Sequence, residues 1–397
     1  MVRGLTIAAL LGTSAWAFPD GENIYERQNG TACSISNNYP AINNAKLPDP
    51  FTFEDGRKVT TKADWTCRAQ EISKLLQQFE LGDYPTPPDK VEASLSGTTM
   101  SVKVTVGSKS VTINTTIRKP STSPGPAIIT IGGSALPIPN TVGTVAFNND
   151  NFASQASGQA RGQGAFYTLF GSTHSAGALT AWAWGVDRVV DGLEQLGAEK
   201  TGIDPKRLGT TGCSRNGKGA FVVGALVSRI ALTLPQESGS GGAACWRISD
   251  AQHAAGANIQ TAGEIISENV WFSKRLDAYA TKTSTMPEDH HMLAALVAPR
   301  GLFVIENDID WLGPVSTTGC MKAGRLVYKA LGAPNNMGFS LVGGHGHCSF
   351  PSSQQADLTT YINYFLLGSN TAPGAIEKSS ANVAVADWAP WTVPTLS

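Results

Sequence analysis

The chain has 397 residues, in which 30 lysines and arginines are balanced by 31 aspartates and glutamates for a formal net charge of −1. No run of basic residues stands out, which argues against nucleic acid or an anionic membrane as a partner. The length fits two ordinary domains or one large α/β domain.

The first 17 residues have the pattern of a secretory signal peptide. Arg3 supplies a positive charge, residues 5–11 are mostly apolar, and Ala15-Trp-Ala17 offers a cleavage site of the small-residue type. The apolar stretch is shorter than the about 20 residues that span a membrane. We therefore expect a secreted, extracellular protein. Its mature part, residues 18–397, contains no Ser/Thr/Pro-rich linker and is expected to form a single domain.

Secretion agrees with the cysteines and with two glycosylation motifs. The chain has six cysteines, and an even number in a secreted protein favours disulfides, although many pairings are possible. No C-x-x-C or H-E-x-x-H spacing indicates a metal site, so we expect no metal. Asn29-Gly-Thr31 and Asn114-Thr-Thr116 are candidate acceptors for N-linked sugar.

The segment from residue 67 to residue 117 has the patterns of a helix and a hairpin. Apolar residues at positions 72, 75, 76 and 79 share one helical face, which predicts a helix over 67–79. Residues 99–106 and 110–117 alternate between apolar and polar side chains, as antiparallel strands with one face in water do. We expect these strands to form a hairpin around residues 107–109.

From residue 127 onward, short apolar strands alternate with helices. We predict strands at 127–131, 143–147, 207–210, 230–234, 300–306 and 337–342. We predict helices at 179–196, 220–227, 320–331 and 358–367. This alternation indicates βαβ units and a mostly parallel sheet. The predicted fold class is therefore α/β, with an antiparallel hairpin on its N-terminal side.

The segment after the strand at 207–210 has the pattern of a nucleophile elbow. It reads Thr211-Gly-Cys-Ser-Arg-Asn-Gly-Lys-Gly-Ala220 and joins that strand to an apolar, helix-like run. Gly212 and Gly217 allow a sharp turn, with Ser214 at its tip as the candidate nucleophile. The usual spacing is G-x-S-x-G, so Gly217 comes one residue late. The sequence supplies no physical reason for that shift.

Two histidines are candidates for the general base that a serine nucleophile needs. His345 and His347 both follow the last predicted strand, and the carboxyl ends of parallel strands are where active sites gather. A disulfide between Cys213 and Cys348 would hold the elbow against the histidine loop. His347, adjacent to Cys348, would then lie close to Ser214, so we predict His347 as the base.

Several carboxylates are candidates for the acid that orients the base. Glu237 follows the strand after the elbow, while three others follow the next strand: Glu306, Asp308 and Asp310. The residues alone leave this choice open. The order serine, acid, histidine is that of α/β-hydrolases, which predicts a three-layer αβα sandwich.

Two cations follow the candidate nucleophile. The backbone N–H and the guanidinium of Arg215 are suited to an oxyanion hole. A merely structural arginine would be unfavourable there, at the positive end of the helix dipole. Lys218 shares a helix face with Ser214. Two cations beside an esterase serine indicate an oxygen-rich or acidic substrate.

The motif Gly212-Cys-Ser-Arg-Asn-Gly-Lys218 resembles the signature of fungal glucuronoyl esterases, carbohydrate esterase family 15. The similarity extends over nearly all of the mature chain and includes residues 131–135, 236–242, 290–300 and 346–348. That family cleaves esters between 4-O-methyl-glucuronic acid of glucuronoxylan and lignin alcohols. The resemblance therefore implies a secreted serine esterase that needs no cofactor, with one α/β-hydrolase catalytic domain. The absence of a Ser/Thr/Pro-rich linker from residues 18–397 predicts that they include no carbohydrate-binding module.

The resemblance also implies roles for single residues. It selects Ser214 as nucleophile, His347 as base, Glu237 as acid and Arg215 for the oxyanion hole. The residues implied to contact the uronate are Lys218, Gln260, Glu268 and Trp311. The disulfides implied are Cys33–Cys67, Cys213–Cys348 and Cys245–Cys320.

Two other functions stay open at this point. The first is an acetyl-xylan or feruloyl esterase on the same fold, which differs in the side of the ester that carries the sugar. The second is a non-catalytic, hydrolase-like binding protein, because a fold does not fix a function. No extended hydrophobic interface is visible in the sequence, so we expect a monomer.

Overall fold

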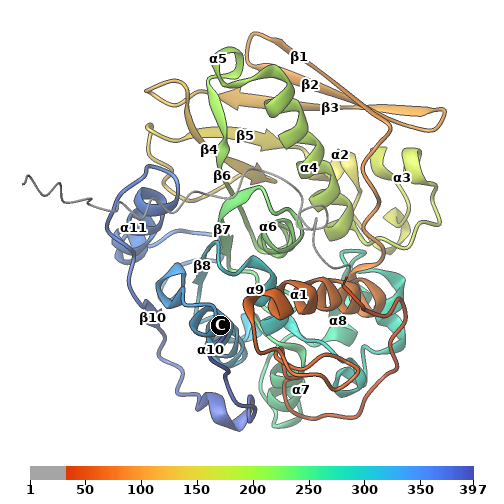
Figure 1. Cartoon of the computed structure of the whole chain (residues 1–397), viewed down its shortest axis with the longest axis vertical. Coiled ribbons are helices and arrows are strands. Elements are labelled where there is room, and N and C mark those ends of the chain that lie inside the picture. The colour runs from red at the N-terminus through yellow and green to blue at the C-terminus, as the bar shows by residue number, and fades with distance from the viewer. Residues whose placement is uncertain (1–32) are drawn as a thin grey trace, which may run out of the picture.

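A ten-stranded sheet runs through the protein, which we describe from a computed structural model covering residues 33–397 (Figure 1). The predicted signal peptide and the sequon at Asn29 therefore lie outside the described residues. The strand order is β1-β2-β3-β5-β4-β6-β7-β8-β9-β10. The strands are β1 (Lys90–Ser96), β2 (Thr99–Val106), β3 (Lys109–Arg118), β4 (Gly125–Ile131), β5 (Gly143–Phe147), β6 (Ile203–Cys213), β7 (Ile230–Gln236), β8 (Gly301–Glu306), β9 (Met337–Leu341) and β10 (Glu377–Lys378).

The sheet has an antiparallel part and a parallel part. Strands β1, β2, β3 and β5 pair antiparallel in that order, and all pairs from β5 to β10 are parallel. β3 alternates between buried and exposed residues, whereas every residue of β4, β7 and β8 is buried. Parallel strands are buried on both faces because the crossover helices cover them.

Helices cover both faces of the parallel part, which makes a three-layer αβα sandwich. On β4, Ile129 packs into the larger hydrophobic cluster and its neighbour Ile128 packs into a smaller one on the opposite face. The smaller cluster contains residues of α11 (Gln355–Phe365), at the left of Figure 1. The larger one contains residues of α1 (Lys62–Leu76), α4 (Ala178–Leu196), α6 (Arg215–Leu226), α9 (His290–Val297) and α10 (Pro314–Ala330).

Shorter helices occupy the connections. They are α2 (Asn149–Phe152), α3 (Ala165–Phe170), α5 (Ala198–Thr201), α7 (Trp246–Ala254) and α8 (Ala262–Glu268), and a π-helical turn (Gln77–Leu81) continues α1. Every strand and helix that the sequence predicts is present, with shifted ends. β1 adds a third strand to the hairpin. Neither β1 nor the two-residue β10 is among the strands that the sequence predicts.

Three disulfides cross-link the described part of the chain. They are Cys33–Cys67, Cys213–Cys348 and Cys245–Cys320, the pairings that the family resemblance implies. All six cysteines are used.

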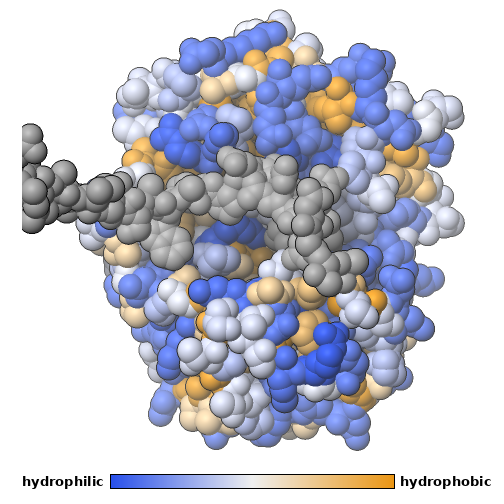
Figure 2. All heavy atoms as spheres, in the orientation of Figure 1, coloured by the Kyte–Doolittle hydropathy of each residue, from blue (hydrophilic) through white to orange (hydrophobic). Residues whose placement is uncertain are grey.

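The visible surface is mostly hydrophilic. On the face that Figure 2 shows, hydrophobic residues form only small separate groups. Among residues 33–397, Leu367 is the one large hydrophobic side chain that is more than a third exposed. None of the helices in this range combines the length and apolar character that crossing a bilayer requires.

Candidate active site

Ser214 stands at the turn between β6 and α6 in a strained backbone conformation. Its φ is 60° and its ψ is −128°, a region that residues with a side chain rarely adopt. The Ser214 N–H donates to the carbonyl of Gln236 on β7 (2.9 Å), and the Ser214 carbonyl accepts from the N–H of Lys218 (3.0 Å). The neighbouring strand and the first turn of α6 thus hold this turn in place.

The late glycine of the elbow has a physical reason in the packing of α6 against β7. A Cβ on Gly217 would lie 2.4 Å from the carbonyl oxygen of Gln236, the same oxygen that binds the Ser214 N–H. A Cβ on Gly212 would lie 2.4 Å from the carbonyl oxygen of Asn216. Both approaches are backbone contacts, which leave no room for a methyl group. The spacing G-x-S-x-x-G therefore follows from where the helix meets the end of β7.

We expect Gly217→Ala to destabilise the protein by about 1–3 kcal/mol, as overpacking does, and to lower kcat. The added methyl must push α6 from β7 and so displace Ser214. Gly263→Ala in α8 is the matched control, because its Cβ would meet nothing closer than 3.9 Å. Thermal unfolding and ester hydrolysis measured side by side test this account. Equal stability and rate for Gly217→Ala and the parent would contradict it.

Glu237 and His347 form the hydrogen-bonded pair that faces this elbow. His347 Nδ1 lies 2.7 Å from Glu237 Oε2, which also accepts from the N–H of Cys348 (2.8 Å). The carboxylate is buried, with its side chain 1% exposed. If Nδ1 donates to the carboxylate, Nε2 is left to accept a proton. His347 Nε2 is buried and has no hydrogen-bond partner among the described residues.

His345, the competing histidine, bonds to the backbone of its own loop. Its Nε2 lies 2.7 Å from the carbonyl of Val342, and its Nδ1 lies 3.1 Å from the carbonyl of Gly346. Its Nδ1 is 3.8 Å from Glu237 Oε1, beyond hydrogen-bond distance. Unlike His347, it does not line the cavity described below.

The other candidate acids lie elsewhere. Glu306 Oε1 accepts from both the N–H and the hydroxyl of Ser238 (2.8 Å each), and burial raises the pKa of Glu306 to about 8. Asp308 and Asp310 are exposed. Within residues 33–397, no hydrogen bond joins any of these three carboxylates to His347. Glu237 is the carboxylate that the structure places on this imidazole.

The disulfide Cys213–Cys348 joins the two loops directly, since each cysteine precedes or follows a candidate catalytic residue. Three non-glycine residues in the described chain have a positive φ: Ser214 (60°), Glu237 (45°) and Cys348 (64°). Backbone strain of this kind persists where the surroundings enforce it and clusters at functional sites. All three strained residues belong to this one place.

A cavity of about 290 Å³ opens over these residues. Its lining contains all eight residues predicted for catalysis and substrate contact: Ser214, Arg215, Lys218, Glu237, Gln260, Glu268, Trp311 and His347. The ring of Trp311 meets the imidazole of His347 edge to face, with centroids 4.9 Å apart. The Gln260 side-chain amide donates to Glu268 Oε2 (3.1 Å).

Lys218 is the buried cation of this cavity. The residue is 4% exposed, its Nζ donates to the carbonyl of Ser238, and it lies 5.6 Å from the ring centre of Trp271. Burial lowers the pKa of Lys218 to about 8, against the opposing pull of Glu306 and Glu268. The two acidic groups therefore offset part of the cost of burying this amine.

Arg215 is exposed at the mouth of the cavity, and its guanidinium makes no hydrogen bond to a described residue. It is free to reach a bound ester. Gly132 and Gly133, which follow β4, do not line the cavity. A Cβ on Gly132 would lie 2.1 Å from the side-chain amide of Asn216, so this glycine serves packing.

Two lining residues escaped the sequence analysis, Trp271 and Leu312. Trp271 is 4% exposed, and its indole N–H donates to the side chain of Gln155 (2.6 Å). No motif surrounds either residue, so only their position in space reveals them. Across residues 33–397, no group of three or more histidines, cysteines or carboxylates is arranged to hold a metal ion.

Comparisons with known proteins all point to one family. A family model described as "Glucuronyl esterase, fungi" matches residues 102–332. The chain is 64% identical to a 4-O-methyl-glucuronoyl methylesterase of Thermothelomyces thermophilus and 65% identical to one of Neurospora crassa. Each alignment covers 99% of both chains.

Solved structures agree with these relatives. A glucuronoyl esterase from Sporotrichum thermophile has a TM-score of 0.91 and 66% identity, covering 92% of this chain and 100% of that chain. A mutant of that enzyme, in complex with methyl 4-O-methyl-β-D-glucopyranuronate, matches equally well. The glucuronoyl esterase catalytic domain from Hypocrea jecorina has a TM-score of 0.89 and 52% identity, over 91% and 100%. The chain therefore belongs to the family of fungal glucuronoyl esterases.

Proposed function

We propose that this enzyme hydrolyses the ester bonds between 4-O-methyl-D-glucuronic acid of glucuronoxylan and lignin alcohols. The observation that supports this most is the hydrogen bond of 2.7 Å between His347 and Glu237 in a cavity shared with Ser214. The relatives with 64% and 65% identity are named 4-O-methyl-glucuronoyl methylesterases. The fold, the nucleophile motif and the cavity are consistent with the same reaction.

The reaction proceeds through an acyl-enzyme. The hydroxyl of Ser214 attacks the ester carbonyl while His347 Nε2 takes its proton, and Glu237 stabilises the imidazolium from the Nδ1 side. The oxyanion that forms is stabilised by the backbone N–H and guanidinium of Arg215. His347 then protonates the departing alcohol. It next activates a water molecule, which releases the uronic acid and restores the serine.

Four residues of the cavity hold the sugar. Lys218, Gln260 and Glu268 offer a cation, an amide and a carboxylate to the hydroxyl and methoxy oxygens of the uronate ring. Trp311 presents an indole to the apolar side of the ring beside His347. The lignin alcohol leaves through the open side of the cavity, where the exposed Arg215 lies.

The setting of this activity is extracellular. The signal-peptide pattern of residues 1–17, the three disulfides and the sequons at Asn29 and Asn114 support secretion and glycosylation. Asn114 lies on β3 and is exposed, so a sugar chain there meets solvent. Scarcity of exposed hydrophobic side chains in the described chain supports a monomer. Residues 18–397 act as one catalytic domain that degrades plant biomass.

A panel of three esters tests the proposed activity. The purified protein is expected to hydrolyse the methyl ester of 4-O-methyl-glucuronic acid and to leave acetylated xylan and methyl ferulate largely intact. The reason is that Lys218, Gln260 and Glu268 suit a sugar on the acyl side of the ester. Activity on acetylated xylan or ferulate alone would assign the protein to another esterase class. No activity on any ester would favour a binding protein.

A further inference from the structure

A second cavity lies apart from the one that contains Ser214. Its volume is about 330 Å³, against about 290 Å³ for the active-site cavity, and the two have no lining residue in common. Its walls come from four stretches of chain: residues 45–46, the helix α7, residues 281–284 and Trp388. No histidine of the described chain lines it, so residues 33–397 place no serine–histidine pair there. Its chemistry is that of binding.

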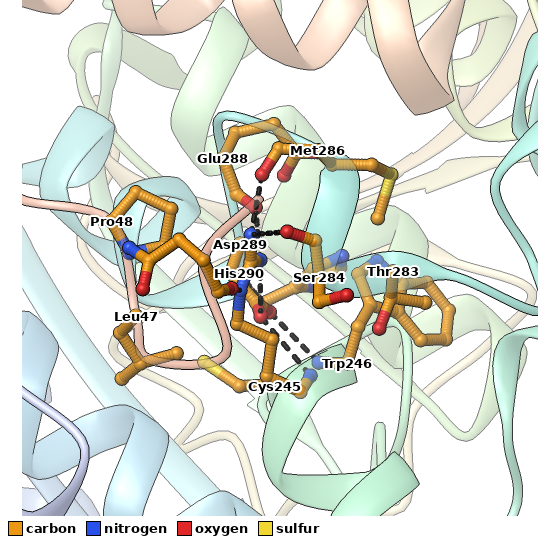
Figure 3. Close-up of polar contacts among 12 residues, drawn as sticks. Leu47, Pro48, Cys245, Trp246, Thr283, Ser284, Met286, Glu288, Asp289 and His290 are labelled. Atoms are coloured by element: carbon orange, nitrogen blue, oxygen red, sulfur yellow. Dashed lines mark hydrogen bonds and ion pairs between the residues drawn. The ribbon is translucent and has the colours of Figure 1, made fainter. Parts of the chain in front are cut away.

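Buried polar contacts fix the floor of this cavity (Figure 3). Arg247 of α7 lines it, although the residue is only 3% exposed. Its guanidinium donates to the carbonyl of Glu288 (2.8 Å) and to the carboxylate of Asp289 (3.1 Å). Its Nε donates to the carbonyl of Asn44 (2.9 Å), whose N–H donates to the carbonyl of Ser284 (3.0 Å). The separate segments are therefore joined before a ligand arrives, which lowers the entropy cost of binding one.

One wall combines an aromatic ring with a cation. Lys46 is exposed, and its Nζ lies 5.3 Å from the ring centre of the partly exposed Trp388. The same ammonium donates to the carbonyl of Asp387 (2.6 Å). An ammonium has three N–H groups, so it keeps donors for a ligand. If Lys46 binds the carboxylate of a ligand, the ring that carries this carboxylate lies against the indole of Trp388.

The lining also contains a second cation and groups for hydroxyls. Lys282 is exposed at the rim. Asp250 of α7 accepts a hydrogen bond from the hydroxyl of Thr283 (2.5 Å). Since the charges of Arg247 and Asp289 compensate each other in the floor, the rim has two cations and one carboxylate. This excess of positive charge favours an anionic ligand.

We propose that this cavity, lined by Lys46, Asp250, Lys282 and Trp388, is an accessory site for a uronic acid residue of a polysaccharide. The lysines bind the carboxylate, Trp388 packs on the sugar ring, and Asp250 accepts sugar hydroxyls. The identity of the polymer rests on the proposed function, because a substrate with several uronic acid side groups can place one in each cavity. Attachment at two points raises the effective concentration of the polymer at Ser214.

Binding to the full chain carrying Ser214→Ala tests the accessory site without turnover. Titration calorimetry with a xylo-oligosaccharide bearing free 4-O-methyl-glucuronic acid is expected to show two sites per chain. Adding Trp388→Ala, or the surface change Lys282→Met, weakens one site about tenfold, as expected for a lost stacking or charge-assisted contact, and leaves the other unchanged. Lys103→Met, an exposed lysine of β2 outside both cavities, is the matched control and keeps both sites.

Kinetics with Ser214 present separate this inference from the proposed function. Lys282→Met is expected to keep kcat/KM on the small methyl ester and to lower it about three- to tenfold on the polymeric ester, through loss of the second attachment point. One site per chain overturns the accessory site. The inference is also overturned if the affinity of the second site is unchanged by both substitutions. The same holds if that site binds the unsubstituted oligosaccharide with equal affinity, or binds a lignin-like aromatic alcohol and not the uronic acid. Failure of the proposed function appears separately, as no turnover of the methyl ester by the parent enzyme.

Discussion

Replacing Ser214 by alanine is expected to lower kcat about a million-fold, to the residual rate that binding and oxyanion stabilisation alone sustain. The acyl-enzyme cannot form without the hydroxyl, and among residues 33–397 no other serine lines the cavity. The substitution removes one atom and leaves φ at 60°, so the fold is expected to remain intact. Steady-state hydrolysis of a methyl glucuronate ester measures the loss.

Ser349→Ala is the matched control for this prediction. Ser349 is exposed and lies two residues beyond His347, so it shares the histidine loop without lining the cavity. Its activity should equal that of the parent. A Ser214→Ala protein that keeps a hundredth of the parent activity or more would show that another residue is the nucleophile.

Glu237→Gln is expected to lower kcat about ten-thousand-fold. The carboxylate accepts from His347 Nδ1 (2.7 Å) and from the N–H of Cys348 (2.8 Å). A neutral amide does not stabilise the imidazolium, and its NH₂ group favours the wrong imidazole tautomer by donating to Nδ1. KM should change little, because Glu237 acts mainly through the base.

The carboxylates after β8 provide the controls for Glu237. Asp308→Asn and Asp310→Asn remove exposed charges that have no hydrogen bond to His347 in the described chain, so both should stay near the parent rate. A severe loss in Asp308→Asn with a near-normal Glu237→Gln would place the acid one strand later.

The alternating pattern of strands and helices was sufficient to predict the parallel sheet, because helices separate the strands from β5 onward. β1 was not predictable in the same way. Its residues alternate between exposed and partly exposed, so its stability depends on pairing with β2 and not on its own apolar pattern. β10 is held only by two pairs with β9.

Some residues of the candidate site could be predicted from a local motif, and others depend on contacts between distant segments. Ser214 could be predicted because the elbow is a local motif. The choice of Glu237 over Glu306 depends on how β7 and β8 lie beside the histidine loop, which residues alone leave open and the family resemblance supplied. The reason for Gly217 is a contact with the carbonyl of Gln236, which lies on another strand. Trp271 could not be predicted as a lining residue either, because only the fold brings it to the cavity.

The disulfide Cys213–Cys348 has a consequence for how the enzyme is inactivated. It closes a covalent loop over 135 residues of sequence, and each of its cysteines is bonded in sequence to Ser214 or His347. A molecule that melts with this link intact keeps its nucleophile and its base tethered together, and cooling returns them to the same neighbourhood. Heating and reduction therefore inactivate this enzyme in different ways. Melting disorders the pair, whereas only reduction lets its members diffuse apart.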